Sequence, residues 1–161
     1  MDAQTFQREA MKHERLLYRI SYAMLHSDAD CADAVQEALL RAWQHRNELR
    51  NMAYFRSWLC RILMNACNDI LRRRAKLTLV PLEEATDIGI RERDTLALRQ
   101  ALEKLPPEQN ACIVMHYLEG WPVADIAAMM GVPEGTVKTR LLYGRNRLSR
   151  LLGEEWEEVE A

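Results

Sequence analysis

The sequence predicts an all-α fold of two small helical domains joined by a flexible linker. Apolar residues recur every three to four positions along most of the chain, and no segment alternates between apolar and polar residues as a strand does. Helical periodicity stops at residues 77–93, an acidic segment that contains Pro81 and Gly89. We therefore predict a first domain at residues 1–76, a linker at 77–93, a second domain at 94–153 and an acidic tail at 154–161.

The first domain should contain three or four helices. Three of them are marked by apolar stripes, at residues 16–24, 34–43 and 55–71. Asp28 or Asp30 would cap the N-terminus of the helix that carries the second stripe. The polar residues 44–53 predict a loop before the third stripe.

The second domain should contain four helices. The first begins near Asp94 and ends at a pair of prolines. Pro107, the second of the pair, suits the first position of the next helix, because its φ is fixed and it has no amide hydrogen to donate. That helix extends to Gly120, Pro122 begins the third helix, and the fourth occupies residues 134–151.

The last two of these helices have the spacing of a helix-turn-helix, whose second helix lies in the DNA major groove. Apolar residues on both helices are spaced to pack together across the turn at Gly131. Near the start of the second helix, Thr136, Lys138 and Thr139 could reach base edges, whereas the arginines suit phosphates. The candidate contacts with duplex DNA are Thr136, Lys138, Thr139, Arg140, Leu142, Tyr143, Arg145 and Arg147.

The net charge of −2 conceals a segregation of charge along the chain. Residues 1–76 hold 13 basic and 9 acidic side chains, and residues 96–152 hold 7 and 5. The excess of acid lies in the linker and the tail. Two basic surfaces separated by an acidic segment suit a protein that contacts a phosphate backbone twice.

Aromatic and basic residues are interleaved after the loop of the first domain. Such a pattern can stack unpaired bases while holding their phosphates, as single-strand binders do. The residues concerned are Tyr54, Phe55 and Trp58, with Arg50, Arg56 and Arg61. The spacing of Phe55 and Trp58 equally fits, and more often indicates, two side chains of a helical core.

Other classes of protein find little support in the sequence. The four cysteines form no CxxC pair and no zinc-like cluster with histidine, so we expect reduced, buried thiols and no metal. Neither a phosphate-binding glycine loop nor a set of catalytic carboxylates is present, and we expect neither an enzyme nor a cofactor nor a small-molecule substrate. Without an apolar run of membrane-spanning length or a secretory signal, the expected location is the cytoplasm.

Two groups of motifs, one in each domain, resemble the extracytoplasmic-function (ECF) sigma factors, a branch of the sigma-70 family of bacterial RNA polymerase. Their order and spacing also fit, over about residues 10–152. In the first domain they are DAVQEA (33–38), RAW (41–43) and FRSWL (55–59), followed by Arg61, Ile62, Asn65, Asp69 and the arginines 72–74. In the second they are ALEKLPPEQ (101–109), YLEG (117–120), DIA (125–127) and GVPEGTVKTR (131–140).

This resemblance implies a non-catalytic promoter-specificity subunit that binds promoter DNA and core RNA polymerase, at the clamp helices of the largest subunit and at the flap. The positions that match the clamp-binding surface are Asp33, Gln36, Glu37 and Arg41. The first domain would melt the −10 element and capture an unpaired base, with Leu49, Arg50, Asn51, Tyr54, Arg56, Arg61 and Asn65 as candidate contacts. The second domain would read the −35 element as duplex, and an anti-sigma factor would hold the protein inactive.

The chain departs from the family pattern at several positions. Asn110 stands where the family usually has arginine, and Trp121 begins a segment that is usually Leu-Ser-Tyr. Tyr143 removes a positive charge from the reading face. The alternative interpretation is a stand-alone helix-turn-helix regulator that binds operators as a dimer, which explains residues 96–152 but gives no purpose to residues 58–74.

Overall fold

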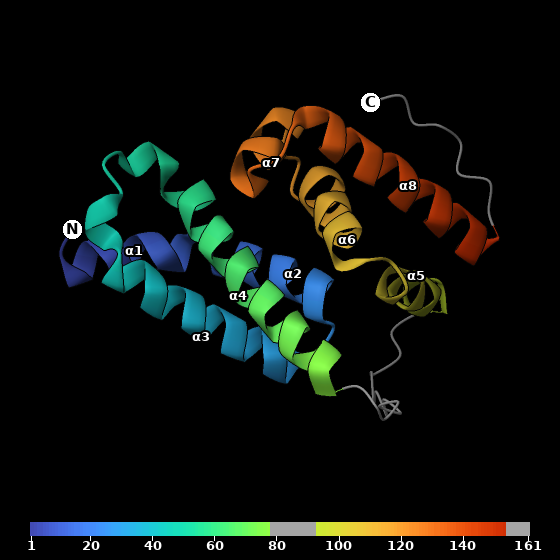
Figure 1. Cartoon of the computed structure of the whole chain (residues 1–161), viewed down its shortest axis with the longest axis horizontal. Coiled ribbons are helices and arrows are strands. Elements are labelled where there is room, and N and C mark those ends of the chain that lie inside the picture. The colour runs from blue at the N-terminus through green and yellow to red at the C-terminus, as the bar shows by residue number, and fades with distance from the viewer. Residues whose placement is uncertain (78–92, 154–161) are drawn as a thin grey trace.

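The computed structural model describes residues 1–77 and 93–153 of the chain. All regular structure within these residues is helical, which confirms the all-α prediction (Figure 1). Two groups of helices, one before and one after the undescribed segment, pack side by side (Figure 1). Apart from Leu77 and Arg93, the predicted linker and acidic tail lie outside the described residues.

The first group contains four α-helices and two short 3₁₀ turns. The helices are α1 (Ala3–Lys12), α2 (Glu14–Leu25), α3 (Asp28–Gln44) and α4 (Phe55–Leu77), and the turns are η1 (Arg46–Glu48) and η2 (Met52–Tyr54). Helix α1 has no apolar stripe of its own in the sequence. It is held by Phe6, whose ring meets those of Trp43 and Phe55 edge-on at centroid distances of 5.4 and 6.0 Å.

The predicted cap of α3 is wrong. Neither Asp28 nor Asp30 precedes the helix; the cap is Ser27, in extended conformation, whose Oγ accepts a hydrogen bond from Asp30 N at 3.3 Å. Both aspartates lie in the first helical turn, where a negative charge complements the helix dipole. Asp30 also forms an ion pair with Arg74 near the end of α4, and this pair ties the two helices together.

The second group contains α5 (Arg93–Glu103), α6 (Pro107–Ile113), η3 (Val114–Leu118), α7 (Val123–Met130) and α8 (Glu134–Leu152). The four α-helices begin close to the predicted positions, and Pro107 does occupy the start of α6. The helix expected over 107–120 continues past Ile113 as a π-helical turn, η3. Gly131 ends α7 with a positive φ of 69°, which glycine adopts without steric cost.

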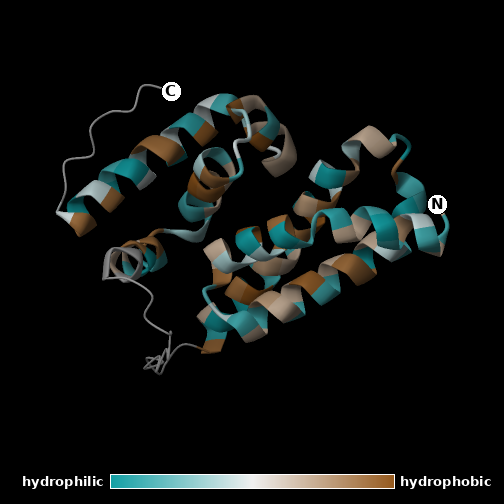
Figure 2. Cartoon of the chain, turned by 180° about the vertical axis from the view of Figure 1, so that it is seen from behind, coloured by the Kyte–Doolittle hydropathy of each residue, from teal (hydrophilic) through white to brown (hydrophobic). Residues whose placement is uncertain are grey.

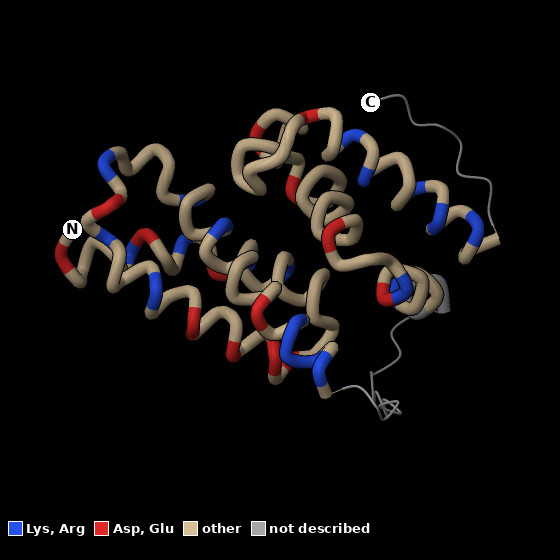
Figure 3. The backbone as a smooth tube through the Cα atoms, in the orientation of Figure 1, with Lys and Arg blue, Asp and Glu red and all other residues tan. Residues whose placement is uncertain are grey.

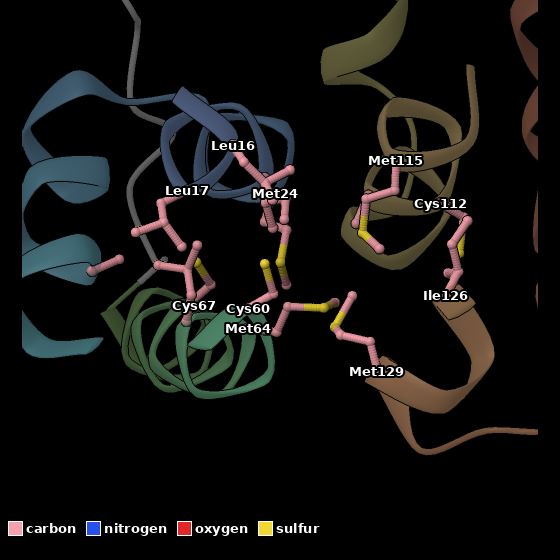
Figure 4. Close-up of a cluster of buried hydrophobic side chains, with 14 of the residues drawn as sticks. Leu16, Leu17, Met24, Cys60, Met64, Cys67, Cys112, Met115, Ile126 and Met129 are labelled. Carbon is pink, nitrogen blue, oxygen red and sulfur yellow. The ribbon is translucent and has the colours of Figure 1, made fainter. Parts of the chain in front are cut away.

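The two groups share one continuous apolar core. Buried residues from both groups belong to one cluster, and brown, apolar segments recur along the helices of both halves (Figure 2). Figure 4 shows side chains from α2 and α4 on one side and from η3 and α7 on the other, with Met64 and Met129 directed toward each other. The four cysteines are all free and buried in this core, as expected.

Candidate nucleic-acid interface

Helix α8 has a buried face and an exposed, partly basic face. Val137, Leu141, Gly144 and Leu148 point into the core. A Cβ on Gly144 would lie 3.1 Å from Ile113 Cγ1, so the absence of a side chain lets α8 approach α6 closely. The opposite face is exposed and carries four of the predicted duplex-DNA contacts, Lys138, Thr139, Leu142 and Tyr143. Lysine and arginine are spread along this helix (Figure 3).

The other predicted contacts on α8 differ in their exposure to solvent and in their polar partners. Arg147 is exposed, whereas Thr136 and Arg145 are half-buried, and Arg145 Nη1 donates to the Tyr117 hydroxyl at 3.0 Å. Arg140 is turned toward α6: its Nη2 lies 3.3 Å from Glu108 Oε2, and its side chain is only 21% exposed. Sequence spacing alone did not reveal this ion pair, because Glu108 is distant in the chain.

The loop between α3 and α4 presents the predicted single-strand contacts. Asn51 Oδ1 accepts a hydrogen bond from Ala53 N at 2.9 Å, which fixes the start of the η2 turn. Beside it, Arg50 is exposed and the Tyr54 side chain is 63% exposed, whereas Leu49 is half-buried against the core. The loop therefore offers a polar rim and a free aromatic ring to a nucleic acid.

Phe55 and Trp58 belong to the core rather than to this rim. Phe55 is 1% exposed, and the ring of Trp58 lies 5.9 Å from it between centroids. This confirms the core interpretation of the pair. Tyr54 is then the aromatic residue of the motif that remains accessible.

Three further predicted contacts, Arg56, Arg61 and Asn65, are exposed along α4. Two of them also touch the second group of helices. The Arg56 guanidinium carbon lies 4.3 Å above the centroid of the Trp121 ring, and Arg61 Nη2 lies beside Gly131.

The four predicted polymerase contacts lie on one face of the first domain. Asp33, Gln36 and Glu37 are exposed on α3, and Arg41 bridges α3 to α4 by bonding to Glu37 and Asp69, both at 2.9 Å. Hydrogen bonds from Arg41 and Arg72 lower the pKa of Asp69, which keeps this carboxylate charged. These residues line a shallow depression of about 570 Å³ together with Leu40, Ala66, Asp69, Ile70 and Arg73.

Sequence reasoning missed Leu40 on this face. The side chain is 52% exposed although it is apolar, and it follows Gln36 and Glu37 at helical spacing. An apolar residue in the polar stripe of an amphipathic helix is the pattern that could have identified it.

The buried cysteines outside these surfaces have thiols of low reactivity. Burial raises the pKa of the Cys60 and Cys67 thiols to about 12 and that of Cys112 to about 11, so these cysteines stay protonated. Within the described ranges, no three His, Cys, Asp or Glu side chains lie close enough to hold a metal ion. None of the helices described is both long and apolar enough to cross a membrane.

Two family models match the chain in order. Sigma-70 region 2 matches residues 10–77, and the region 4 model of the same family matches residues 95–148. The ECF RNA polymerase sigma factor SigM of Mycobacterium tuberculosis is 39% identical over 155 residues, which cover 94% of this chain and 79% of SigM. SigL, an ECF sigma factor of the same organism, is 35% identical over 153 residues, covering 89% of this chain and 86% of SigL.

Two solved structures share the fold. The sigma factor RpoE of Bartonella quintana, crystallised with the anti-sigma factor NepR, aligns over 96% of this chain and 100% of its own with a TM-score of 0.76 at 24% identity. CnrH, in complex with the cytosolic domain of CnrY, aligns over 96% of this chain and 92% of its own with a TM-score of 0.70 at 23% identity. The two family models and the sequence relatives lead to one assignment, with which the exposed, partly basic face of α8 and the exposed loop before α4 agree: the chain belongs to the ECF sigma factors of the sigma-70 family, promoter-specificity subunits of RNA polymerase.

Proposed function

We propose that the two domains divide promoter recognition between them. The second domain reads the −35 element as duplex through α8, and the first domain binds core polymerase and opens the −10 element. The observation that carries this proposal is the exposed face of α8, where Lys138, Thr139, Leu142 and Tyr143 stand opposite a fully packed face. A helix with one packed face and one exposed face can enter the major groove without disturbing the packing of its domain.

In the first domain, the loop before α4 is the proposed site for the unpaired −10 strand. Extruding a base costs a few kcal/mol, which stacking and phosphate contacts must offset. Tyr54 offers an exposed ring, and the exposed side chains of Arg50, Arg56 and Arg61 offer positive charge. Leu49, Asn51 and Asn65 complete the proposed contact set.

The depression between α3 and α4 is the proposed docking surface for the clamp helices of the polymerase. Asp33, Gln36 and Glu37 supply free polar groups, and the ion pairs of Arg41 hold the two helices in register. Leu40 adds an exposed apolar side chain to this surface, which Ala66 and Ile70 also line. A mixture of apolar and polar groups is the usual composition of a protein interface.

Sigma factors are non-enzymatic subunits, and we propose that this chain acts in the cytoplasm without catalysis of its own. The two solved structures of the same fold contain inhibitory or regulatory partners, NepR and the cytosolic domain of CnrY. By analogy, an anti-sigma factor is the proposed regulator of this chain.

The direct test is transcription by purified protein and core polymerase on a library of promoter templates. Specific initiation that depends on both components supports the proposal. The stand-alone regulator instead predicts tight duplex binding by the isolated protein as a dimer, measured by gel shift and by its mass in solution. Tight dimeric operator binding with no initiation at any template would overturn the sigma assignment of the site.

A further inference from the structure

A hydrogen bond joins the π-helical turn η3 to helix α8. The hydroxyl of Tyr117 accepts it from Nη1 of Arg145 at 3.0 Å. Tyr117 is 42% exposed and Arg145 is half-buried, so the pair lies at the surface. The sequence predicts Arg145 as a contact with duplex DNA but not Tyr117, because Tyr117 precedes the helix-turn-helix. The structure thus brings a residue from another element next to a predicted DNA contact.

The backbone of η3 is fixed where it presents Tyr117. A hydrogen bond from Glu119 N to the carbonyl oxygen of Val114, at 3.1 Å, closes the π-helical turn. His116 Nδ1 lies 2.8 Å from the carbonyl oxygen of Trp121, and because a carbonyl oxygen only accepts, this nitrogen carries the proton and donates it. The imidazole meets the Tyr117 ring edge-on at a centroid distance of 4.9 Å. The phenol therefore projects from a braced turn, with its hydroxyl at α8.

The phenol is a neutral partner, so it holds the Arg145 guanidinium without cancelling its charge. Arg140 on the same helix differs, because its Nη2 lies 3.3 Å from the carboxylate of Glu108. Among the residues that the structure describes, Arg145 has no carboxylate partner of this kind. A tyrosine hydroxyl that accepts one hydrogen bond still has its own O–H to donate. The pair therefore presents a free positive charge and a hydroxyl donor side by side.

Two adjacent donors, one of them a guanidinium, suit a phosphate group. The planar guanidinium has further N–H groups beside the one bonded to Tyr117, and hydrogen bonds from a charged donor to an anion are the strong ones. Arg145 follows Lys138 by about two helical turns, so both residues lie on the same flank of α8. Most hydrogen bonds between proteins and DNA go to phosphate and sugar, and they position a recognition helix without reading sequence.

From these contacts we propose that Tyr117 and Arg145 together bind one backbone phosphate of the −35 duplex, so that the DNA interface extends from α8 onto η3. The Tyr117 hydroxyl holds the guanidinium in place through the existing hydrogen bond and donates its own O–H to the same phosphate. This inference rests on the proposed function, since it concerns the same duplex. Because a phosphate contact carries no sequence information, the pair strengthens binding to every −35 sequence alike.

The first experiment measures the affinity of the holoenzyme for promoter DNA. Tyr117→Phe removes only the hydroxyl, and Arg145→Ala removes the guanidinium. The matched control is Tyr18→Phe, since Tyr18 is also 42% exposed but lies on α2 in the first domain. Each variant is assembled with core polymerase and titrated onto a promoter duplex by gel shift at a series of salt concentrations. Thermal melting of each variant, followed by circular dichroism, checks that it is folded.

Tyr117→Phe should lower the affinity about threefold to tenfold, the effect of one ordinary hydrogen bond, and leave the melting temperature unchanged. Arg145→Ala should lose at least as much, and its plot of log affinity against log salt should be shallower by about 1. The double variant should lose less than the product of the two single losses, because both residues serve one phosphate. Losses that multiply, or a Tyr117→Phe affinity equal to that of Tyr18→Phe, would overturn the inference.

The second experiment locates the phosphate. Each phosphate of the −35 element is replaced in turn by an uncharged methylphosphonate, and the original holoenzyme should lose affinity at the position that the pair binds. Tyr117→Phe and Arg145→Ala should both be less sensitive to substitution at that position, whereas Tyr18→Phe should behave like the original. If Arg145→Ala loses this sensitivity and Tyr117→Phe keeps it, the inference fails and the proposed function stands. If no −35 phosphate matters and neither Lys138→Ala nor Arg145→Ala weakens binding, the proposed role of α8 fails as well.

Discussion

Arg61 and Gly131 lie in direct contact, although 70 positions separate them in the sequence. A Cβ at Gly131 would stand 2.5 Å from Arg61 Nη2, and Gly131 also needs its positive φ of 69° to end α7. One glycine therefore serves both the turn of the helix-turn-helix and the close approach of the two domains. The contact joins the element proposed to read duplex DNA to the helix proposed to hold the opened strand.

Substituting alanine for this glycine separates the two roles. Gly131→Ala should lower the free energy of unfolding by about 1 kcal/mol, because an L-residue is strained at positive φ. Gly120→Ala is the matched control, since Gly120 has a φ of 72° and nothing within 4 Å of its Cβ position. Gly131→Ala should lose more stability in urea than Gly120→Ala, because its Cβ must also displace the Arg61 guanidinium. Equal losses in the two variants would show that Arg61 moves aside freely.

Two basic residues of α8 should have different effects on promoter choice. Lys138, exposed near the start of the helix, is proposed to read bases, and Arg147, about two and a half turns later, is proposed to hold a phosphate. Lys138→Ala should cost about 1–3 kcal/mol at particular −35 sequences and relax specificity there, whereas Arg147→Ala should weaken all promoters about equally. Transcription from a panel of −35 variants measures both. A uniform loss for Lys138→Ala would assign it to the backbone instead.

Leu40 should matter to polymerase binding more than to folding. Leu40→Asp places a charge on the proposed clamp-binding face and should weaken binding to core polymerase at least tenfold. Its melting temperature should hardly change, because half of the side chain is already exposed. Met11→Asp in α1 is the control, an exposed apolar residue, 64% accessible, outside that face. Equal affinity of the two variants for core polymerase would place the interface elsewhere.

His26 should make the stability of the protein fall in mild acid. Burial, with a smaller contribution from Arg74, lowers the pKa of His26 to about 4 from an unfolded value of 6.5. Between these values the unfolded chain binds a proton that the folded one does not, so stability declines as the pH falls from 6.5 toward 4. Above pH 6.5 the group has no effect. His26→Asn suits the positive φ of 51° at this position and should flatten this part of the profile of melting temperature against pH.

Much of the fold follows from the apolar periodicity of the sequence, because each stripe records which face of a helix is buried. This periodicity predicts the order of the helices, the start of α6 at Pro107 and the turn at Gly131. It does not predict helix α1, since that helix buries only Phe6 and Ala10. The cap of α3 cannot be predicted from the sequence, because serine and aspartate are equally good caps and only the extended backbone of Ser27 decides between them.

The candidate site could be predicted where it depends on one helix and not where it depends on two. The exposed face of α8 and the stripe of Asp33, Gln36 and Glu37 repeat at helical spacing, so sequence reasoning finds them. The pairing of Arg140 with Glu108 and the contact of Arg61 with Gly131 join distant segments. No local pattern encodes them, because they arise from how the helices pack.

The most direct measurement is initiation by the purified protein with core polymerase on a randomised promoter library, followed by sequencing of the transcripts and permanganate mapping of the opened strand. Transcripts should begin downstream of a shared pair of −35 and −10 sequences, with opening at −10 only when both components are present. The Lys138→Ala variant should shift the selected −35 sequence and leave the −10 sequence unchanged. Initiation without any shared promoter sequence, or none above core polymerase alone, would contradict the division of promoter recognition between the two domains.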